Sequence, residues 1–422
     1  MLATLGRAIK IGDLRARILF TLAMLLVFRL GVHVPTPGVI PERVAPLFAT
    51  GSIFQLLDLF AGGALATVSV FAMSITPYIN ASIIVQLLTV VIPRLEELAK
   101  EGEEGRRRLT QLTRYGTVVM ALLQAGGIAY YLHRAGALEW PGFPGMAVVA
   151  ITLTAGTVLL MWIGEQITEN GIGNGISLLI FAGIVSRLPH GLVTLTEMWR
   201  AGSVTLFQIL LLVVLGLAVI VAVVWVTEGQ RRIPVQYAKR VVGRRIYGGQ
   251  STHIPIRVNQ AGVIPVIFAA SLVALPLTVA GFFPQAGWSQ FIGRWFGWGT
   301  PLNTVIYFWL IVGFTFFYTA ITFNPQDIAD NLRKYGGYIP GLRPGRPTAE
   351  YLARVVTRIT VAGALFLALI SVLPLLVRGV THIATVYFGG TALLIVVGVA
   401  LETMKQIEAH LLMRQYQGFM KR

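Results

Sequence analysis

The six histidines are the residues of this sequence best suited to bind a metal or transfer a proton. They are scattered, with no His-Glu-x-x-His motif and no paired carboxylates at catalytic spacing: His33, His133, His190, His253, His382 and His410. A zinc site or an intramembrane protease needs such groups close together. The chain also lacks cysteine, which excludes disulfides, cysteine-bound zinc and thiol nucleophiles. We therefore expect no metal site and no catalytic residues.

Phosphate-binding motifs are missing as well. No Gly-Lys dipeptide occurs, so the sequence has no Walker A loop and does not hydrolyse nucleotide itself. Residues 171–175, Gly-Ile-Gly-Asn-Gly, superficially resemble a dinucleotide fingerprint, but they lack the third glycine at the required spacing and lie between two apolar stretches. We interpret them as a tight turn and predict a protein that is not an enzyme and binds no cofactor.

The composition is that of an integral membrane protein. The 422 residues are 55% hydrophobic and only 12% charged, with a mean hydropathy of +0.73, too few polar side chains to cover a water-exposed surface. The net charge of +16 could indicate nucleic acid binding. Arginine and lysine, however, lie almost wholly in the connections between apolar stretches, which is the pattern that sets membrane topology.

Ten apolar stretches are each long enough to cross a bilayer. They are residues 18–34, 69–92, 115–132, 146–163, 172–188, 204–226, 261–283, 302–323, 361–377 and 383–401. With the N-terminus inside, 27 of the 34 basic residues fall on the inner side, and omitting the weak fifth stretch reverses this bias. The sequence predicts an all-α polytopic membrane protein with ten transmembrane helices and both termini in the cytoplasm.

One apolar region is too long to be a single span. Residues 52–92 would form a continuous helix of ~60 Å, twice the thickness of the hydrocarbon core. We expect a break at Gly62 and Gly63, which leaves residues 52–60 as a short apolar piece. This piece lies either inside the helix bundle or in a re-entrant turn on the outer side.

Two inner connections are much longer than joining two spans requires. Residues 227–260 alternate β-branched or aromatic with polar residues, a hairpin pattern, and residues 324–352 open with a helical pattern and end in a turn around Arg343. One interpretation is that these basic loops only set the membrane topology. Their size also favours a docking surface.

Ionisable residues are scarce in the predicted spans. Arg29 lies near the outer end of the first, and Asp58 is the one acidic residue at possible membrane depth. An ion-coupled transporter needs ionisable or ion-coordinating groups near the midplane. A pathway lined by aliphatic residues instead suits a protein that must seal against ions while opening for an apolar or polymeric cargo.

Six segments in order carry a family resemblance over about residues 13–413. They are FAMSITPYINASIIVQLLTVV, EGEEGRRRLTQLTRYGT, ENGIGNGISLLIFAGIV, EGQRRIPVQYAKR with YGGQSTHIPIRVNQAGVIPVIFA, FNPQDIADNLRKYGGYIPGLRPG, and YFGGTALLIVVGVALE. In these segments the chain resembles the SecY/Sec61-alpha family, the channel subunits of protein translocons. The resemblance implies a clamshell of two pseudo-symmetric five-helix halves, residues 1–200 and 201–422, around an hourglass pore.

The resemblance also implies a ring of aliphatic side chains at the waist of the pore and a plug against it. The matching ring positions are Ile75, Ile79, Ile180, Ile184, Ile267 and Ile395. The plug corresponds to residues 52–66, with Phe54, Leu57, Asp58, Phe60, Gly62 and Gly63 as its expected residues. Isoleucine at such spacing is otherwise common on lipid-facing helices, and the resemblance does not explain Asp58.

A lateral gate is expected between spans two and three on one side and spans seven and eight on the other. Asn80 and Gln86 are the polar residues of span two that could face this seam, or they could be ordinary interhelical hydrogen-bond partners. Arg244, Arg245 and Arg343 match arginines that dock partners in the family.

The implied partners are the SecE and SecG subunits, the motor ATPase SecA, the ribosome, signal sequences, nascent polypeptides and membrane lipid. The function that follows is a protein-conducting channel of the bacterial cytoplasmic membrane, driven by a partner, which translocates secretory polypeptides and releases membrane segments sideways. A secondary solute transporter and a non-conducting scaffold are the alternatives.

Overall fold

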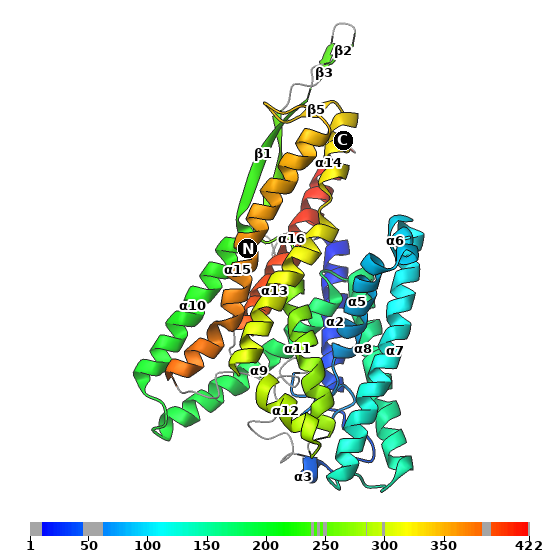
Figure 1. Cartoon of the computed structure of the whole chain (residues 1–422), viewed down its shortest axis with the longest axis vertical. Helices are drawn as coiled ribbons and strands as arrows, with labels where there is room; N and C mark the ends of the chain where they lie inside the picture. Colours follow the sequence, from blue (N-terminus) through cyan, green and yellow to red (C-terminus); the bar gives the residue numbers. More distant parts are fainter. Residues whose placement is uncertain are drawn as a thin grey trace.

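The computed structural model describes residues 11–44, 62–237, 240–242, 245–247, 251–283, 285–297, 300–381 and 390–420. Each of the ten predicted spans overlaps a long helix of this structure (Figure 1). These helices are α2 (Gly12–Gly31), α5 (Thr76–Val91), α7 (Glu103–Arg134), α8 (Phe143–Asn170), α9 (Gly175–Arg200), α10 (Leu206–Glu228), α11 (Ile264–Phe282), α13 (Pro301–Thr322), α15 (Arg346–Thr381) and α16 (Gly390–Met420).

Shorter helices lie between them: α3 (Pro41–Val44), α6 (Pro93–Lys100), α12 (Gly287–Phe296) and α14 (Pro325–Lys334). Within the described ranges, seven helices are long and apolar enough to cross a membrane, or up to eight if α5 and α6, bent by 101° at Ile92, count as one span. A helical protein with several membrane-crossing segments is therefore confirmed, and the count of ten stays a prediction.

Side-chain caps begin several of the helices where the sequence offers them. Asn174 accepts a hydrogen bond from the Ser177 N–H at the start of α9, and Thr205 and Gln208 form a capping box at the start of α10. The glycine-rich segment before α9 is a tight turn, as predicted. In that turn Gly173 has a φ of +93°, a left-handed conformation that suits glycine.

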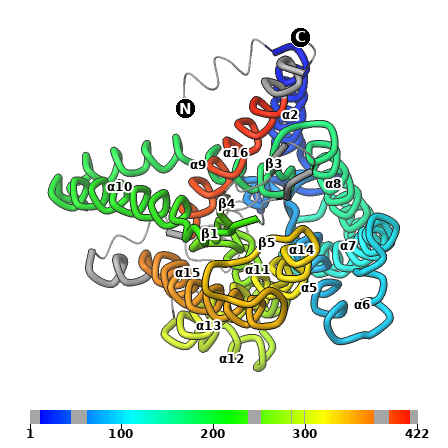
Figure 2. The backbone as a smooth tube through the Cα atoms, turned by 90° about the horizontal axis from the view of Figure 1, so that it is seen from above, coloured from blue at the N-terminus to red at the C-terminus, as the bar shows by residue number. Residues whose placement is uncertain are grey.

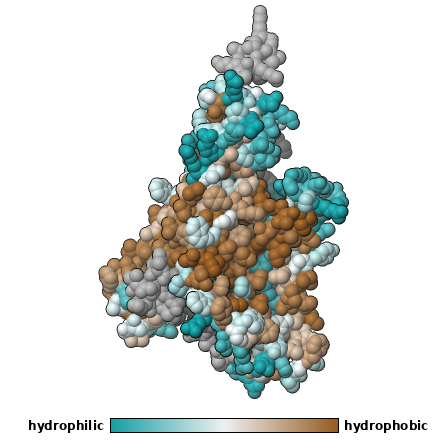
Figure 3. All heavy atoms as spheres, viewed as in Figure 1, coloured by the Kyte–Doolittle hydropathy of each residue, from teal (hydrophilic) through white to brown (hydrophobic). Residues whose placement is uncertain are grey.

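Helix α11 lies between the two groups of helices that form the body. Seen end-on in Figure 2, α5, α7 and α8 lie on one side of α11, and α13 and α15 lie on the other. Helix α11 packs against α5, α7, α13 and α15. On the face shown in Figure 3, hydrophobic residues cover the middle of the molecule and hydrophilic residues gather toward its two ends, the distribution of a membrane-spanning body.

The second predicted span begins later than the sequence suggested. Helix α5 starts at Thr76, and residues 62–75 run as successive turns, with Val68 and Ser74 in the left-handed region at φ +42° and +52°. Hydrogen bonds tie this segment to the chain beyond α2, because Thr36 N–H donates to Val68 O (3.1 Å) and Val70 N–H donates to Val34 O (3.0 Å). These tertiary contacts satisfy backbone groups that a helix would otherwise satisfy internally.

The two long connections form one structure. Strands β1 (Gln230–Tyr237) and β4 (Ser251–Arg257) pair antiparallel, which confirms the predicted hairpin, and β2 (Arg240–Val242) pairs with β3 (Arg245–Tyr247) farther out. The strand β5 (Gly337–Tyr338), from the other connection, adds to β1 and gives the order β4-β1-β5. We call β1, β4, α14, β5 and the start of α15 the loop unit.

The loop unit has a hydrophobic core of its own. Alternate residues of β1 point inward, and they pack with side chains from α14 and α15. The buried members of this core are Ile233, Val235, Ile256, Leu332, Ile339, Leu352, Val355 and Val356. The loop unit is thus a small packed domain rather than two separate loops.

Candidate functional site

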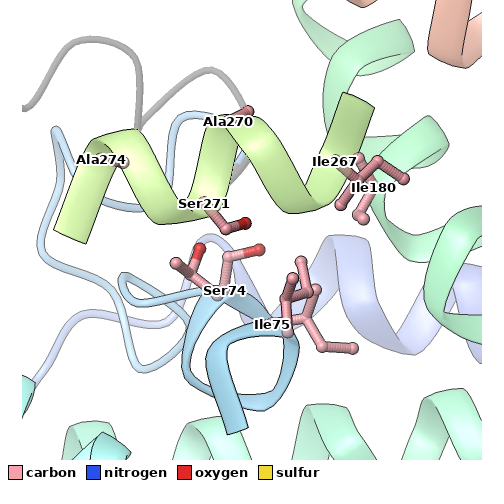
Figure 4. Close-up of a pocket in the computed structure, with 9 residues that line it drawn as sticks. Ser74, Ile75, Ile180, Ile267, Ala270, Ser271 and Ala274 are labelled. Atoms are coloured by element: carbon pink, nitrogen blue, oxygen red, sulfur yellow. The ribbon is translucent and has the colours of Figure 1, made fainter. Parts of the chain in front are cut away.

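Four of the isoleucines predicted for the pore ring surround one small cavity (Figure 4). The cavity is about 20 Å³, room for about a single water molecule. Its lining is mostly aliphatic, with three hydroxyl side chains, and comes from α5 with the two residues before it, α9 and α11. The lining residues are Ser74, Ile75, Thr76, Ile79, Ile180, Ile267, Ala270, Ser271 and Ala274.

The helices place these side chains by their geometry. Ile75 is the N-cap of α5 and Ile79 lies one turn farther, so both point to the same face, while Ile180 of α9 and Ile267 of α11 approach from other sides. All four are buried, with exposed fractions of 1% to 7%. These isoleucines therefore face the interior of the helix bundle and not the surrounding lipid.

Ile184 and Ile395, the two other predicted ring residues, are also buried in the same core. Ile184 lies one turn beyond Ile180 on α9, and Ile395 lies on α16. Neither is among the residues that line the cavity. The structure thus brings four of the six side chains together around the cavity and places the other two elsewhere in the buried core.

Sequence reasoning did not single out the two serines of this cavity. Ser74 precedes α5 and Ser271 lies on α11, and Figure 4 shows Ser271 pointing from its helix toward the side of Ser74. The left-handed φ of Ser74 is a tertiary feature without a local sequence signal. The hydroxyls make the two sides of the seam between α5 and α11 slightly polar next to the isoleucines.

The candidate gate residues behave differently from one another. Asn80 is only 3% exposed, and its amide oxygen and nitrogen find no hydrogen-bond partner among the described residues. Gln86 donates to Ser82 Oγ at 3.4 Å within its own helix. A buried amide without hydrogen-bond partners costs free energy, so Asn80 lowers the stability of the closed packing. It lies on α5, which together with α7 packs against α11.

Of the plug residues, Gly62 and Gly63 are described, and both have positive φ values, +65° and +96°. Arg29 Nη1 donates to Gly62 O at 3.2 Å and to Ser186 Oγ at 3.3 Å. Arg29 thereby links α2, the segment at Gly62 and α9, a role that the sequence did not reveal. Phe54, Leu57, Asp58 and Phe60 lie outside the described residues, so the predicted plug is untested there.

Arg343 occupies an exposed turn of the loop unit. The turn has glycines with φ of +84° at Gly341 and +104° at Gly345, and the Arg343 carbonyl accepts a hydrogen bond from Thr348 Oγ1 at 2.8 Å. Arg245 lies in β3, whose hairpin projects beyond β5 in Figure 1, and Arg244 lies outside the described residues. The hydrogen bond from Thr348 fixes the backbone of the turn, whereas the Arg343 side chain is exposed to solvent.

In the described part of the chain, no group of three or more histidine, aspartate or glutamate side chains is placed to bind a metal ion.

Comparison with known proteins assigns the fold to a family. The SecY family model matches residues 69–404, a range that includes the cavity, the gate residues and the loop unit. The chain belongs to the SecY family. A protein translocase subunit SecY from Halalkalibacterium halodurans is 49% identical over the full length of both chains. The corresponding subunit of Pseudomonas aeruginosa is 46% identical over 98% of this chain and 94% of its own.

Solved structures of SecY-type channels have the same fold. A structure described as a protein-conducting channel superposes with a TM-score of 0.70 at 19% identity, over 94% of this chain and 92% of that one. Sec61 from a canine ribosome-channel complex superposes with a TM-score of 0.66 at 18% identity over the same shares. The fold class predicted from the sequence, a helical SecY-type membrane protein, is confirmed. The roles of the ring, plug and gate residues stay predictions.

Proposed function

We propose that this chain is the channel through which unfolded secretory polypeptides cross the bacterial cytoplasmic membrane, with both termini in the cytoplasm. The supporting observation is the cavity at the waist, where isoleucines from three helices leave room for about one water molecule. The SecY relatives named protein translocase subunits support the same function. A secondary transporter would need a set of ionisable or ion-coordinating groups at midplane depth, whereas the cavity lining contains no ionisable side chain and only three hydroxyl groups.

The closed state follows from the chemistry of the lining. A narrow aliphatic constriction excludes ions because water leaves it, so no charged gate is needed. The side chains of Ile75 and Ile79 from α5, Ile180 from α9 and Ile267 from α11 line one cavity, and side-chain packing between separate helices can part around a passing chain and close again. Residues 1–200 and 201–422 would be the two halves that move apart.

Sideways release into lipid would use the seam where α11 packs against α5 and α7. Asn80 lies buried in α5 with an unsatisfied amide. A signal sequence or a nascent membrane segment entering this seam could supply the missing hydrogen bonds, or water could do so once the seam opens. Gate opening would then relieve a cost that the closed state carries.

The driving force would come from a partner, because the chain has no nucleotide-binding loop. The loop unit presents Arg343 on a fixed turn, and the motor ATPase SecA or the ribosome would dock there, with the β2–β3 hairpin and its Arg244 and Arg245 as a second contact. Two solved relatives are ribosome complexes by description. SecE and SecG would be the accessory subunits.

The direct test uses proteoliposomes that contain this chain with SecE and SecG. We expect a labelled presecretory protein to become protected from protease when SecA and ATP are added, and not when either is left out. Ion-gradient-driven uptake of a small solute without polypeptide protection would instead identify a transporter. Neither activity, in vesicles that hold correctly assembled complex, would contradict the proposal and favour a scaffold.

A further inference from the structure

The end of α11 meets α7 and α12 in a cluster of aromatic side chains. Gly127 of α7 packs directly beneath the ring of Phe282, so closely that a Cβ at this position would overlap the ring. Phe282 is buried at 5% exposure. The missing side chain at Gly127 thus lets the end of α11 approach the backbone of α7.

One turn farther along α7, aromatic rings continue the packing. The Tyr130 ring lies 5.5 Å from the Phe283 ring at an interplanar angle of 41°, and the Phe283 ring lies 5.8 Å from the Trp288 ring of α12 at 53°. These separations and tilts are in the range of favourable aromatic pairs. We call Tyr130, Phe282, Phe283 and Trp288 the aromatic clasp, with Phe283 at its centre.

Two members of the clasp are fixed to α11. Phe283 N–H donates to Ala280 O (3.1 Å), and Ala286 N–H donates to Phe283 O (3.0 Å). Ser289 Oγ, on the first turn of α12, donates to Ala280 O at 2.5 Å and so ties α12 to the end of α11. Phe283 and Trp288 therefore move together with α11, whereas Tyr130 moves with α7.

The clasp lies at the surface, near the ends of both helices. Tyr130, Phe283 and Trp288 are 37%, 43% and 47% exposed, and Tyr130 is close to the end of α7 at Arg134. In the predicted topology this is the outer end of the seam, far from the loop unit. Tyrosine and tryptophan favour the boundary between lipid and water, which fits a cluster placed where the seam reaches the membrane interface.

We propose that the aromatic clasp holds the outer end of the seam between α7 and α11 closed and thereby sets how apolar a segment must be to leave sideways into lipid. This inference rests on the proposed channel function. The four rings bridge the two predicted halves, so opening the seam there must separate the rings of Tyr130 and Phe283. An apolar segment can compensate for that cost by its own transfer into lipid, whereas a polar segment cannot.

The test measures the partition of model segments with increasing numbers of leucines between insertion and complete translocation. Phe283→Ala removes both aromatic pairs. For a segment near the wild-type midpoint we expect the ratio of inserted to translocated product to rise about threefold, because only the Tyr130–Phe283 pair crosses the seam and is separated when the seam opens. Phe291→Ala is the matched control, because Phe291 is 60% exposed on α12 and its ring meets Trp295 of the same helix. It should change the ratio by less than about twofold.

An unchanged ratio in Phe283→Ala would overturn the proposal, and so would an equal rise in both variants, which would trace the effect to α12 in the membrane. If wild-type vesicles fail to translocate a secretory protein, the channel function itself has failed, and the two failures are thereby distinguished.

A second measurement does not depend on the stability of Phe283→Ala. The chain has no cysteine, so Tyr130→Cys with Phe283→Cys gives a single reactive pair for a short bismaleimide. We expect efficient crosslinking at rest and a yield at least about twofold lower while a stalled apolar segment occupies the channel, since the two halves have then separated. If the crosslinking yield stayed the same with an engaged segment, the seam would not open at this point, and the proposed role of the aromatic clasp would be wrong.

Discussion

The loop unit and the isoleucine-lined cavity are built in opposite ways. In the loop unit, strands β4, β1 and β5 are joined by backbone hydrogen bonds, and fully buried side chains such as Val235, Ile256 and Leu352 fill the space between sheet and helices. At the cavity, side chains from α5, α9 and α11, most of them aliphatic, line a small space. Under the proposed function, a docking surface for a driving partner benefits from a fixed shape, and a constriction that must part benefits from contacts that can separate without breaking backbone hydrogen bonds.

The largest effect is expected from reversing the charge of Arg343. The turn that carries it is exposed and shaped by Gly341 and Gly345, so Arg343→Glu should leave the fold intact while translocation driven by SecA falls to near background. Arg343→Lys should recover only part of the rate, because the ammonium group lacks the planar donors of guanidinium. Rates of protease protection in proteoliposomes measure both effects.

The matched control is Arg333→Glu, an exposed basic residue of the last turn of α14. It should cost the helix end only about 0.3–1 kcal/mol and leave most of the translocation rate. If assembled Arg343→Glu protein translocated at the wild-type rate, Arg343 would have no role in coupling to SecA.

The next effect concerns the packing that holds the turn in place. Ile256 is fully buried in the core of the loop unit, and Ile256→Ala should destabilise this unit by about 2–5 kcal/mol. Limited proteolysis of the loops should become faster, and SecA-driven transport should fall even though Arg343 is unchanged. Thr252→Ala, at an exposed position of the same strand, should do neither. Transport at the wild-type rate with an unfolded loop unit would show that the unit need not be rigid.

A small effect is expected from the side-chain bond that joins the two connections. Tyr338 Oη donates to Gln236 Oε1 at 3.1 Å between β5 and β1. Tyr338→Phe should weaken the unit by about 0.5–1.5 kcal/mol and change transport little. Proteolysis rates can detect the difference, with Tyr335→Phe as control because Tyr335 is 76% exposed. A large loss of transport in Tyr338→Phe alone would show that its hydroxyl acts on a partner instead.

Much of this structure could be predicted from sequence because its signals are local. Apolar length locates the helices, and the alternation in residues 230–237 predicts strand β1. The motif resemblance pointed to Ile75, Ile79, Ile180 and Ile267, which the structure brings around one cavity.

The features that sequence reasoning missed depend on contacts between distant residues. Strand β5 is two residues long and forms through the pairing of Gly337 and Tyr338 with the end of β1, about a hundred positions away. The late start of α5 reflects hydrogen bonds to the segment after α2. The role of Arg29 needs both Gly62 and Ser186 in place. No local sequence pattern identifies these distant contact partners, since many other arginines and glycines in the chain have similar neighbours in the sequence.

The most direct test of the account is the ion conductance of the resting channel when its waist is made polar. Ile79→Ser and Ile267→Ser place hydroxyls in the aliphatic lining, and single-channel recordings in planar bilayers should show a higher leak in each variant because water enters the constriction. Ile84→Ser is the control, since Ile84 is 43% exposed on the same helix as Ile79. Leak that rises in the two waist variants and not in Ile84→Ser is the predicted result. Equal, wild-type conductance in all three would contradict an apolar seal at this site.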